Sequence, residues 1–226
     1  MNGRFVKFLA AAALGTATMF GTSITTVTYL NDPLGVNAPY VGKVAILGPN
    51  QVLLYCDDLA DSVTGGESWS AYVTPLSAVI ANVSATNVEF KSLTSGGLNV
   101  ATSLYEQAAW LVYQFAGHAA DNFVIQNAIW SLFNQTNGSV PGQTAGNTDM
   151  TTEGYWLYHA KTSYTTLSAA QINAFLVLTP TGAPQGLGMP QEFFAIAPEP
   201  GTYVLFGAGL ILLSLGTFRR TRRKVN

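Results

Sequence analysis

Two side chains of this sequence, a cysteine and a glutamine, have the chemistry to form a covalent bond with each other. Cys56 is the only cysteine among 226 residues, and it ends an apolar run that begins at Gln51. Gln126 follows 70 residues later, inside a segment with apolar residues at helical spacing. A thiolate can attack an activated side-chain amide, expel ammonia and leave a thioester. The pair could therefore store a reactive acyl group.

The segment that must position Gln126 runs from Asp121 to Phe133 and predicts a helix, with Asp121 as its N-cap. Phe123 lies one turn before Gln126 and Trp130 one turn after it, so the three side chains are expected on similar sides of the helix. The expected buried face consists of Val124, Ile125, Ala128, Ile129, Leu132 and Phe133. An amide between two large aromatic side chains indicates a function for Gln126.

Two motifs resemble the thioester domains of bacterial surface adhesins: the pair Tyr55-Cys56 and the later run Ile125-Gln-Asn-Ala-Ile-Trp130. Those domains carry an aromatic-Cys pair and a hydrophobic-Gln-x-x-hydrophobic-Trp motif. The resemblance covers roughly residues 41–196 and implies a β framework with a helical insertion. Asp57 departs from the pattern, because the family usually has a hydrophobic residue there.

The resemblance implies a role for each matched residue. Cys56 would supply the sulfur of the thioester and Gln126 its acyl group, while Tyr55, Phe123 and Trp130 would keep water away. An amine or hydroxyl on a host or neighbouring surface would attack the Gln126 carbonyl and release the thiol. Because such a bond reacts once, the protein is not expected to be an enzyme, and no cofactor is implied.

Other interpretations stay open. Gln107 is a second candidate for the acyl group. Cys56 and Gln126 could instead be a buried thiol and a hydrogen-bonded amide, in a structural matrix protein or a non-covalent module that binds matrix polysaccharide through Tyr and Trp. A hydrolase ranks lowest, because the chain has no Gly-x-Ser-x-Gly motif and neither His118 nor His159 lies in a recognisable one.

The charge pattern argues against several kinds of site. Three lysines and all twelve acidic residues lie between Lys7 and Arg219, so this long middle part is acidic and is not expected to bind nucleic acid. A single cysteine gives neither an intramolecular disulfide nor a cysteine-rich zinc site. Three nearby carboxylates could suggest calcium, but their spacing does not match an EF-hand loop. We therefore interpret Asp57, Asp58 and Asp61 as a solvated acidic turn and expect no metal site.

The pattern of elements predicts an α+β domain, with strands at both ends and helices between them. Turn signals and β-branched runs predict strands at residues 24–30, 41–47, 51–56, 69–74, 87–93, 172–178 and 191–196. Helical spacing predicts helices at residues 76–83, 98–116, 121–133 and 152–161.

Both ends of the chain carry targeting signals. Residues 1–23 predict a signal peptide, because Arg4 and Lys7 precede an apolar run that is too short to span a bilayer. Near the other end, Pro198-Glu199-Pro200 precedes an apolar run at residues 203–218. As a helix this run would form a short membrane span. The basic cluster that follows it, and that would stay on the cytoplasmic side, is Arg219, Arg220, Arg222, Arg223 and Lys224.

The tail at residues 198–226 resembles the PEP-CTERM sorting tail of Gram-negative bacteria. The resemblance implies processing by an exosortase, a membrane cysteine protease-transpeptidase, in a bacterium that makes extracellular polysaccharide. A plain C-terminal membrane anchor is the alternative. We expect residues 24–197 to be exported across the inner membrane, held in an anchored precursor, and then placed at the cell surface or in the extracellular biofilm matrix, where they would serve in adhesion.

Overall fold

The structure is a computed structural model of the chain, and it describes residues 23–31, 41–47, 50–57, 66–95, 97–133, 149–181 and 192–197. The signal peptide at 1–23, apart from Ser23, and the sorting tail at 198–226 therefore lie outside the described residues, as does the predicted membrane helix at 203–218. Among the residues that are described, no helix is long and apolar enough to cross a membrane.

Six antiparallel strands close into a barrel in the order β1-β2-β3-β8-β7-β4. The strands are β1 (Ser23–Asn31), β2 (Val41–Leu47), β3 (Asn50–Cys56), β4 (Ser68–Pro75), β7 (Phe175–Pro180) and β8 (Phe193–Ile196). Closure is completed late in the chain, because β8 pairs with β3 on one side and with β7 on the other. In the first of these pairings Cys56 lies opposite Phe193.

The barrel has its own apolar core, built from alternate residues of its strands. From β3, Val52, Leu54 and Cys56 contribute to this core, and from β8, Phe193 and Ala195 do so. The residues between them on the strands face the other way. Tyr55 and Phe194 belong to a second core, which lies between the barrel and the helices.

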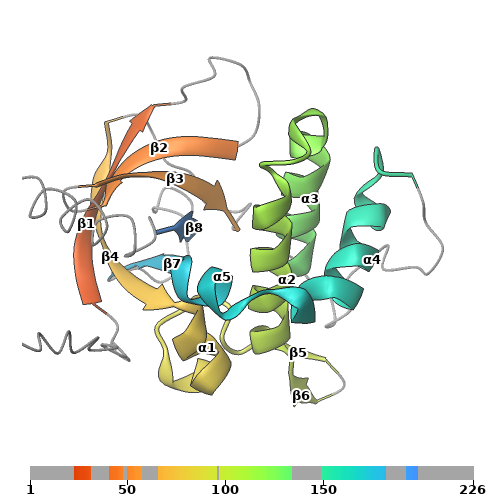
Figure 1. Cartoon of the computed structure of the whole chain (residues 1–226). Coiled ribbons are helices and arrows are strands. Elements are labelled where there is room, and N and C mark those ends of the chain that lie inside the picture. Colours follow the sequence, from red (N-terminus) through yellow and green to blue (C-terminus); the bar gives the residue numbers. More distant parts are fainter. Residues whose placement is uncertain are drawn as a thin grey trace, which may run out of the picture.

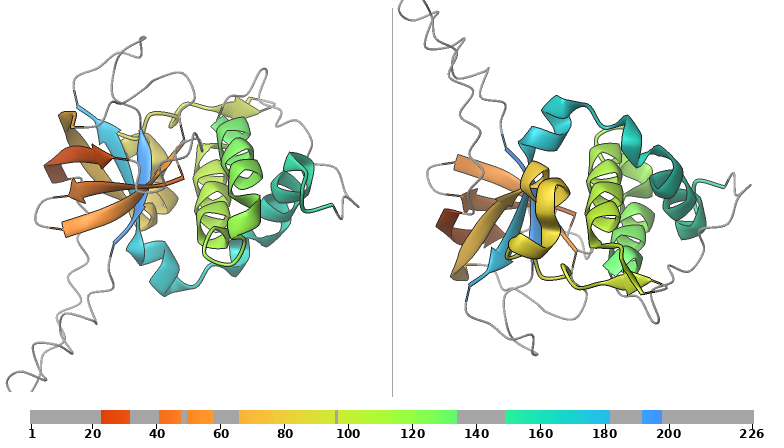
Figure 2. Two further views of the ribbon diagram at one scale, coloured as in Figure 1. Left: turned by 90° about the horizontal axis from the view of Figure 1, so that it is seen from above. Right: turned by 90° about the horizontal axis from the view of Figure 1, so that it is seen from below.

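Helices α2, α3 and α4 form a layer on one side of the barrel, with α4 farthest out, while α1 and α5 lie against the lower end of the barrel in Figure 1 (Figures 1 and 2). Their bounds are α1 (Leu76–Asn82), α2 (Ala101–Gln114), α3 (Asn122–Phe133), α4 (Glu153–Ser163) and α5 (Ala169–Ala174). Short 3-10 turns lie at Val83–Ala85, Ala119–Asp121 and Tyr164–Thr166, and a two-residue hairpin joins β5 (Thr94–Ser95) to β6 (Leu98–Asn99). All the α-helices except α5 have at least one fully buried apolar residue, so the layer is held by packing.

Several predicted elements differ from the structure. The strand expected at residues 87–93 is wrong, since these residues form turns. The strand expected at 172–178 begins only at Phe175, because Ser168 and Gln171 form a capping box that starts α5. The helix expected from Leu98 begins at Ala101, after the β5–β6 hairpin. The α+β class and the placement of helices between strands are confirmed.

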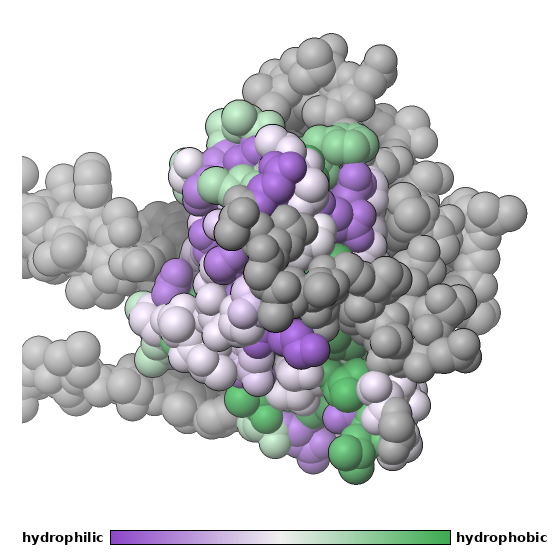
Figure 3. Space-filling view, turned by 90° about the vertical axis from the view of Figure 1, so that its right-hand side faces the viewer, coloured by the Kyte–Doolittle hydropathy of each residue, from purple (hydrophilic) through white to green (hydrophobic). Residues whose placement is uncertain are grey.

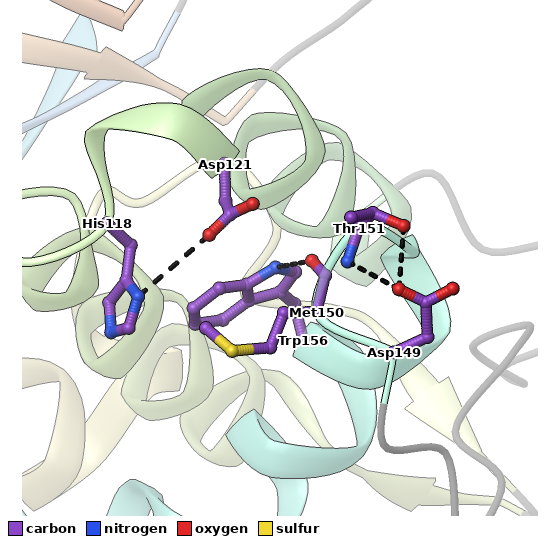
Figure 4. Close-up of polar contacts among 6 residues, drawn as sticks. All are labelled: His118, Asp121, Asp149, Met150, Thr151 and Trp156. Atoms are coloured by element: carbon purple, nitrogen blue, oxygen red, sulfur yellow. Dashed lines mark hydrogen bonds and ion pairs between the residues drawn. The ribbon is translucent and has the colours of Figure 1, made fainter.

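Asp121, the predicted N-cap of α3, lies directly before the first residue of that helix. Asp121 is the last residue of a 3-10 turn that runs into α3, and one of its carboxylate oxygens lies 3.9 Å from Nδ1 of His118 (Figure 4). The His118 ring meets the indole of Trp156 edge-on, and that indole donates a 2.9 Å hydrogen bond to the carbonyl of Met150. The start of α3 is thereby fixed against α4.

The helical face that looks away from the barrel is mainly polar or intermediate in hydropathy where it is visible, with apolar residues gathered at its lower end (Figure 3). The β5–β6 hairpin lies at that end in Figure 1, and its Leu98 is 74% exposed. This apolar surface is remote from the junction between α3 and β3, where the candidate site lies.

Candidate functional site

The structure brings Gln126 and Cys56 together, although they are 70 residues apart. The Nε2 atom of Gln126 donates a 2.6 Å hydrogen bond to the backbone carbonyl of Cys56. Both residues are 0% exposed. The other end of the amide, Oε1 of Gln126, is also buried and has no hydrogen-bond donor among the described residues. A buried amide with one unsatisfied end is costly, so its presence at this point requires an explanation.

Cys56 and Trp130 share the apolar core of the barrel. Trp130 is the one helical residue in that core, and it lies one turn after Gln126 on α3. Gln126 and Trp130 therefore approach the end of β3 from the same helix, as the spacing predicted. The Cys56 side chain lies among buried, mainly apolar side chains, and a thioester shielded from water in this way would be protected from hydrolysis.

The other two expected shielding residues lie elsewhere. Tyr55 is buried, but in the core between barrel and helices, where its ring stacks on Phe115 at a centroid distance of 5.0 Å. Burial raises the pKa of its phenol. Phe123 is 57% exposed, so its expected burial beside Gln126 is wrong. Phe123 is three residues before Gln126 on the helix, so its side chain points in a different direction from that of Gln126 and reaches the surface. Gln107, the second candidate for the acyl group, is buried on α2.

Asp57 is buried rather than part of a solvated turn. It is 1% exposed, and this contradicts the interpretation of the acidic run as a surface feature; Asp58 and Asp61 lie outside the described residues. Neither oxygen of Asp57 has an N–H or O–H donor in the described part of the chain. The group that it meets is a second buried carboxyl, that of Glu192. Two carboxyls can form a hydrogen bond only if one of them carries a proton.

Glu192 accepts more hydrogen bonds than Asp57 does. Its Oε1 accepts a 2.6 Å hydrogen bond from the hydroxyl of Tyr105, and its Oε2 accepts one of 2.9 Å from the Glu89 N–H and a short one from the hydroxyl of Thr179. These three donors come from α2, from the turn after α1 and from β7. An ionised carboxylate is the acceptor that such a set of donors favours.

The two acids differ in how burial affects them. Burial raises the pKa of Asp57 well above its ordinary value, and the neighbouring Glu192 raises it further. Burial also raises the pKa of Glu192, but the hydrogen bonds that Glu192 accepts oppose that rise. We therefore assign the shared proton to Asp57 and the negative charge to Glu192. Burial also raises the pKa of Tyr105, which keeps its hydroxyl a donor.

Sequence reasoning missed this carboxyl pair. No local motif marks it, but both acids border apolar strands: Asp57 directly follows β3 and Glu192 directly precedes β8. Knowing that β3 and β8 are antiparallel neighbours would have placed the end of one beside the start of the other. The missing information was the topology of the barrel.

The remaining predicted site residues lie outside the described part of the chain, namely Pro198, Glu199, Pro200, Arg219, Arg220, Arg222, Arg223 and Lys224. Within the described ranges, no group of three or more His, Cys, Asp or Glu residues could hold a metal ion. Comparison with protein-family models, with curated proteins and with solved structures gave no match.

Proposed function

We propose that this protein is an exported surface protein whose core attaches covalently to a nucleophile through an internal thioester between Cys56 and Gln126. The observation that carries the proposal is the hydrogen bond from the Gln126 amide to the carbonyl of Cys56, formed in a fully buried setting. The contact holds the carboxamide against the backbone of the one cysteine in the chain. A structural glutamine would be expected to use both ends of its amide, and among the described residues only one end of the Gln126 amide has a hydrogen-bond partner.

The bond forms with loss of ammonia. The sulfur of Cys56 attacks the side-chain carbonyl carbon of Gln126, the C–N bond breaks, and the thiol proton leaves with the nitrogen as part of ammonia. An incoming amine later attacks the same carbon and breaks the C–S bond. Its proton passes to the sulfur, and Gln126 becomes a substituted amide. No oxidant or cofactor takes part in either step.

The resemblance of the tail to a PEP-CTERM signal supports the cellular part of the proposal. An exosortase would process the chain near Pro198-Glu199-Pro200 after export across the inner membrane of a Gram-negative bacterium. The core would then reach the cell surface or extracellular matrix. There its target would be a surface amine or hydroxyl, with matrix polysaccharide as a source of hydroxyls.

The mass of the purified full-length chain tests the bond. If it forms, the intact mass should be about 17 Da below that calculated for the same termini, the loss expected when an amide becomes a thioester. Methylamine should restore the thiol of Cys56 and leave a methylamide on Gln126. Cys56→Ala and Gln126→Ala should each abolish both effects, and the double variant should show nothing further, because either partner alone does not react with amines.

Gln107→Ala is the matched control, because Gln107 is also a buried helical glutamine. This variant should keep the mass deficit and the reaction with methylamine. Peptide mapping supplies the contradicting outcome: an unmodified amide at Gln126 together with an unmodified Cys56 in every preparation would exclude the thioester. The non-covalent matrix protein would then be the better description.

A further inference from the structure

Directly beside the Cys56–Gln126 contact, the structure holds the buried carboxyl pair of Asp57 and Glu192, to which the thioester chemistry above gives no task. The Cys56 carbonyl that accepts the Gln126 hydrogen bond belongs to the peptide group joining Cys56 to Asp57. Any movement of Asp57 therefore moves the acceptor that holds the Gln126 amide. On the neighbouring strand, Glu192 precedes Phe193, the residue opposite Cys56.

We propose that Asp57 is a positioning residue for the thioester, held neutral by a proton shared with Glu192 so that the negative charge of the pair stays on the β8 side, away from Cys56. This inference rests on the proposed function. The hydrogen bond between Asp57 and Glu192 would then have two roles. It would fix the peptide group that orients Gln126, and it would keep a negative charge away from the sulfur of Cys56.

The first support is the arrangement of donors. All three protein donors to the pair point at Glu192, from Glu89, Tyr105 and Thr179, and none of the described residues donates to Asp57. A charge on Glu192 is thus stabilised by hydrogen bonds, while a charge on Asp57 would be buried without any. The single proton is therefore best placed on Asp57, where it completes the hydrogen bond between the two acids.

The second support is the distribution of charge around the pair. The titratable groups that act on Asp57 are Glu192 just before β8, Glu89 in the turn after α1, and Cys56 next to it in the chain, while Tyr105 of α2 is itself affected by Asp57. Asp57 is joined to Cys56 by a peptide bond, and a negative charge on either group raises the pKa of the other. An ionised Asp57 would therefore oppose formation of the thiolate that starts the reaction.

Two isosteric variants separate this role from simple packing. Asp57→Asn and Glu192→Gln each leave one amide and one carboxylate in the same space, with a hydrogen bond between them. They differ in which position keeps the negative charge: Glu192 in Asp57→Asn, and Asp57 in Glu192→Gln. Glu192→Gln also replaces one of the oxygens that accept hydrogen bonds from Glu89, Tyr105 and Thr179, so the stability of each variant is measured beside its rate. A purely structural role predicts that any loss of rate follows the loss of stability in each variant, and that the ionisation of Cys56 does not differ between them.

The full-length parent and both variants should be unfolded, refolded and then assayed for the fraction of Gln126 that methylamine converts. Asp57→Asn should form the bond at least as fast as the parent, whereas Glu192→Gln should be slower by about tenfold or more. In Glu192→Gln the ionised Asp57 would disfavour the Cys56 thiolate and could shift the peptide group that holds the Gln126 amide. Equal rates for the two variants, or a slower Asp57→Asn, would overturn the inference.

A second measurement keeps this test separate from that of the thioester itself. In a Gln126→Ala background the bond cannot form, and the ultraviolet absorbance of the thiolate reports ionisation of Cys56, with Cys56→Ala as the blank. Adding Asp57→Asn should let Cys56 ionise at lower pH than adding Glu192→Gln. If this order holds but the parent never shows a thioester, the charge placement stands and the proposed function fails. If the order is reversed or absent, the positioning role is wrong.

Discussion

The two faces of strand β3 meet different environments, one mainly apolar and the other polar. The inner face contributes Val52, Leu54 and Cys56 to the barrel core, which is mainly apolar. The opposite face presents Tyr55 and Asp57 to the helices, where two carboxyls, a phenol and a threonine hydroxyl are buried together. Strand β3 therefore lies between two environments. The one on its inner face is mainly apolar and would protect a thioester, and the one on its opposite face is polar and can hold a proton.

This comparison shows why neighbouring residues need not share a function. Cys56 and Asp57 are adjacent in the chain, and alternation along the strand sends their side chains to opposite faces. What the two residues do share is the peptide group between them, and Gln126 binds that group. Coupling between the two environments would pass through this one backbone unit.

The largest expected effect comes from the leucines of β3. Leu54 is 0% exposed in the barrel core, while Leu53, its neighbour, is 48% exposed. Leu54→Ala should lower the free energy of unfolding by about 2–5 kcal/mol, because it leaves a cavity. Leu53→Ala should change it by less than about 1 kcal/mol. Denaturant titration of both variants measures the difference, and equal losses would show that the two faces are not distinct.

A smaller effect is expected on the polar side, at Tyr105. Its hydroxyl donates to Glu192 and accepts a 3.1 Å hydrogen bond from the Phe90 N–H. Tyr105→Phe should cost about 1–3 kcal/mol of stability, since it leaves a buried carboxylate with one donor fewer and an N–H without an acceptor. Tyr113→Phe is the control, because the Tyr113 hydroxyl donates to the Gln171 carbonyl in a part-buried position. If Tyr113→Phe lowers the free energy of unfolding as much as Tyr105→Phe does, the comparison between the two faces fails.

These differences between the two faces were only partly predictable from sequence. The short apolar run that ends at Cys56 predicted the strand, and apolar residues at helical spacing around Gln126 predicted the helix that meets it, because both patterns are local. Phe123 was misplaced because residues three apart on a helix are separated by an angle large enough to bring one of them to the surface. Glu192 could not be linked to Asp57, because their contact depends on the non-local pairing of β3 with β8.

The smallest expected effect is a slope of stability against pH. The folded pKa values of Asp57 and Glu192 lie above their ordinary values, so the folded state binds more protons than the unfolded chain over that range. The stability that this pair contributes is therefore fully present below the ordinary carboxyl pKa, near about pH 4, and is lost as pH rises through the raised pKa values of the folded state. The slope is at most about 1.4 kcal/mol per pH unit for each proton.

Thermal unfolding across a pH series measures this slope. Asp57→Asn removes the group with the greater rise, so its stability should decline less steeply with increasing pH than that of the parent. Asp149→Asn is a suitable control, because Asp149 is exposed and hydrogen bonds from Thr151 lower its pKa. A parent whose stability rises steadily over the same range would mean that the pair does not hold a proton in the folded protein.

The position of β8 in the chain also decides when the reactive pair can exist. β3 is synthesised early, but its neighbour β8 is the last strand that the structure describes, and all five α-helices of the described chain lie between them. Pairings between segments so distant in sequence form late, because closing the long loop costs entropy before the contacts between the strands can stabilise the chain. A partly made chain thus has Cys56 at an open sheet edge with no partner for Asp57, and a nascent polypeptide would carry an inert thiol until its final strand is in place.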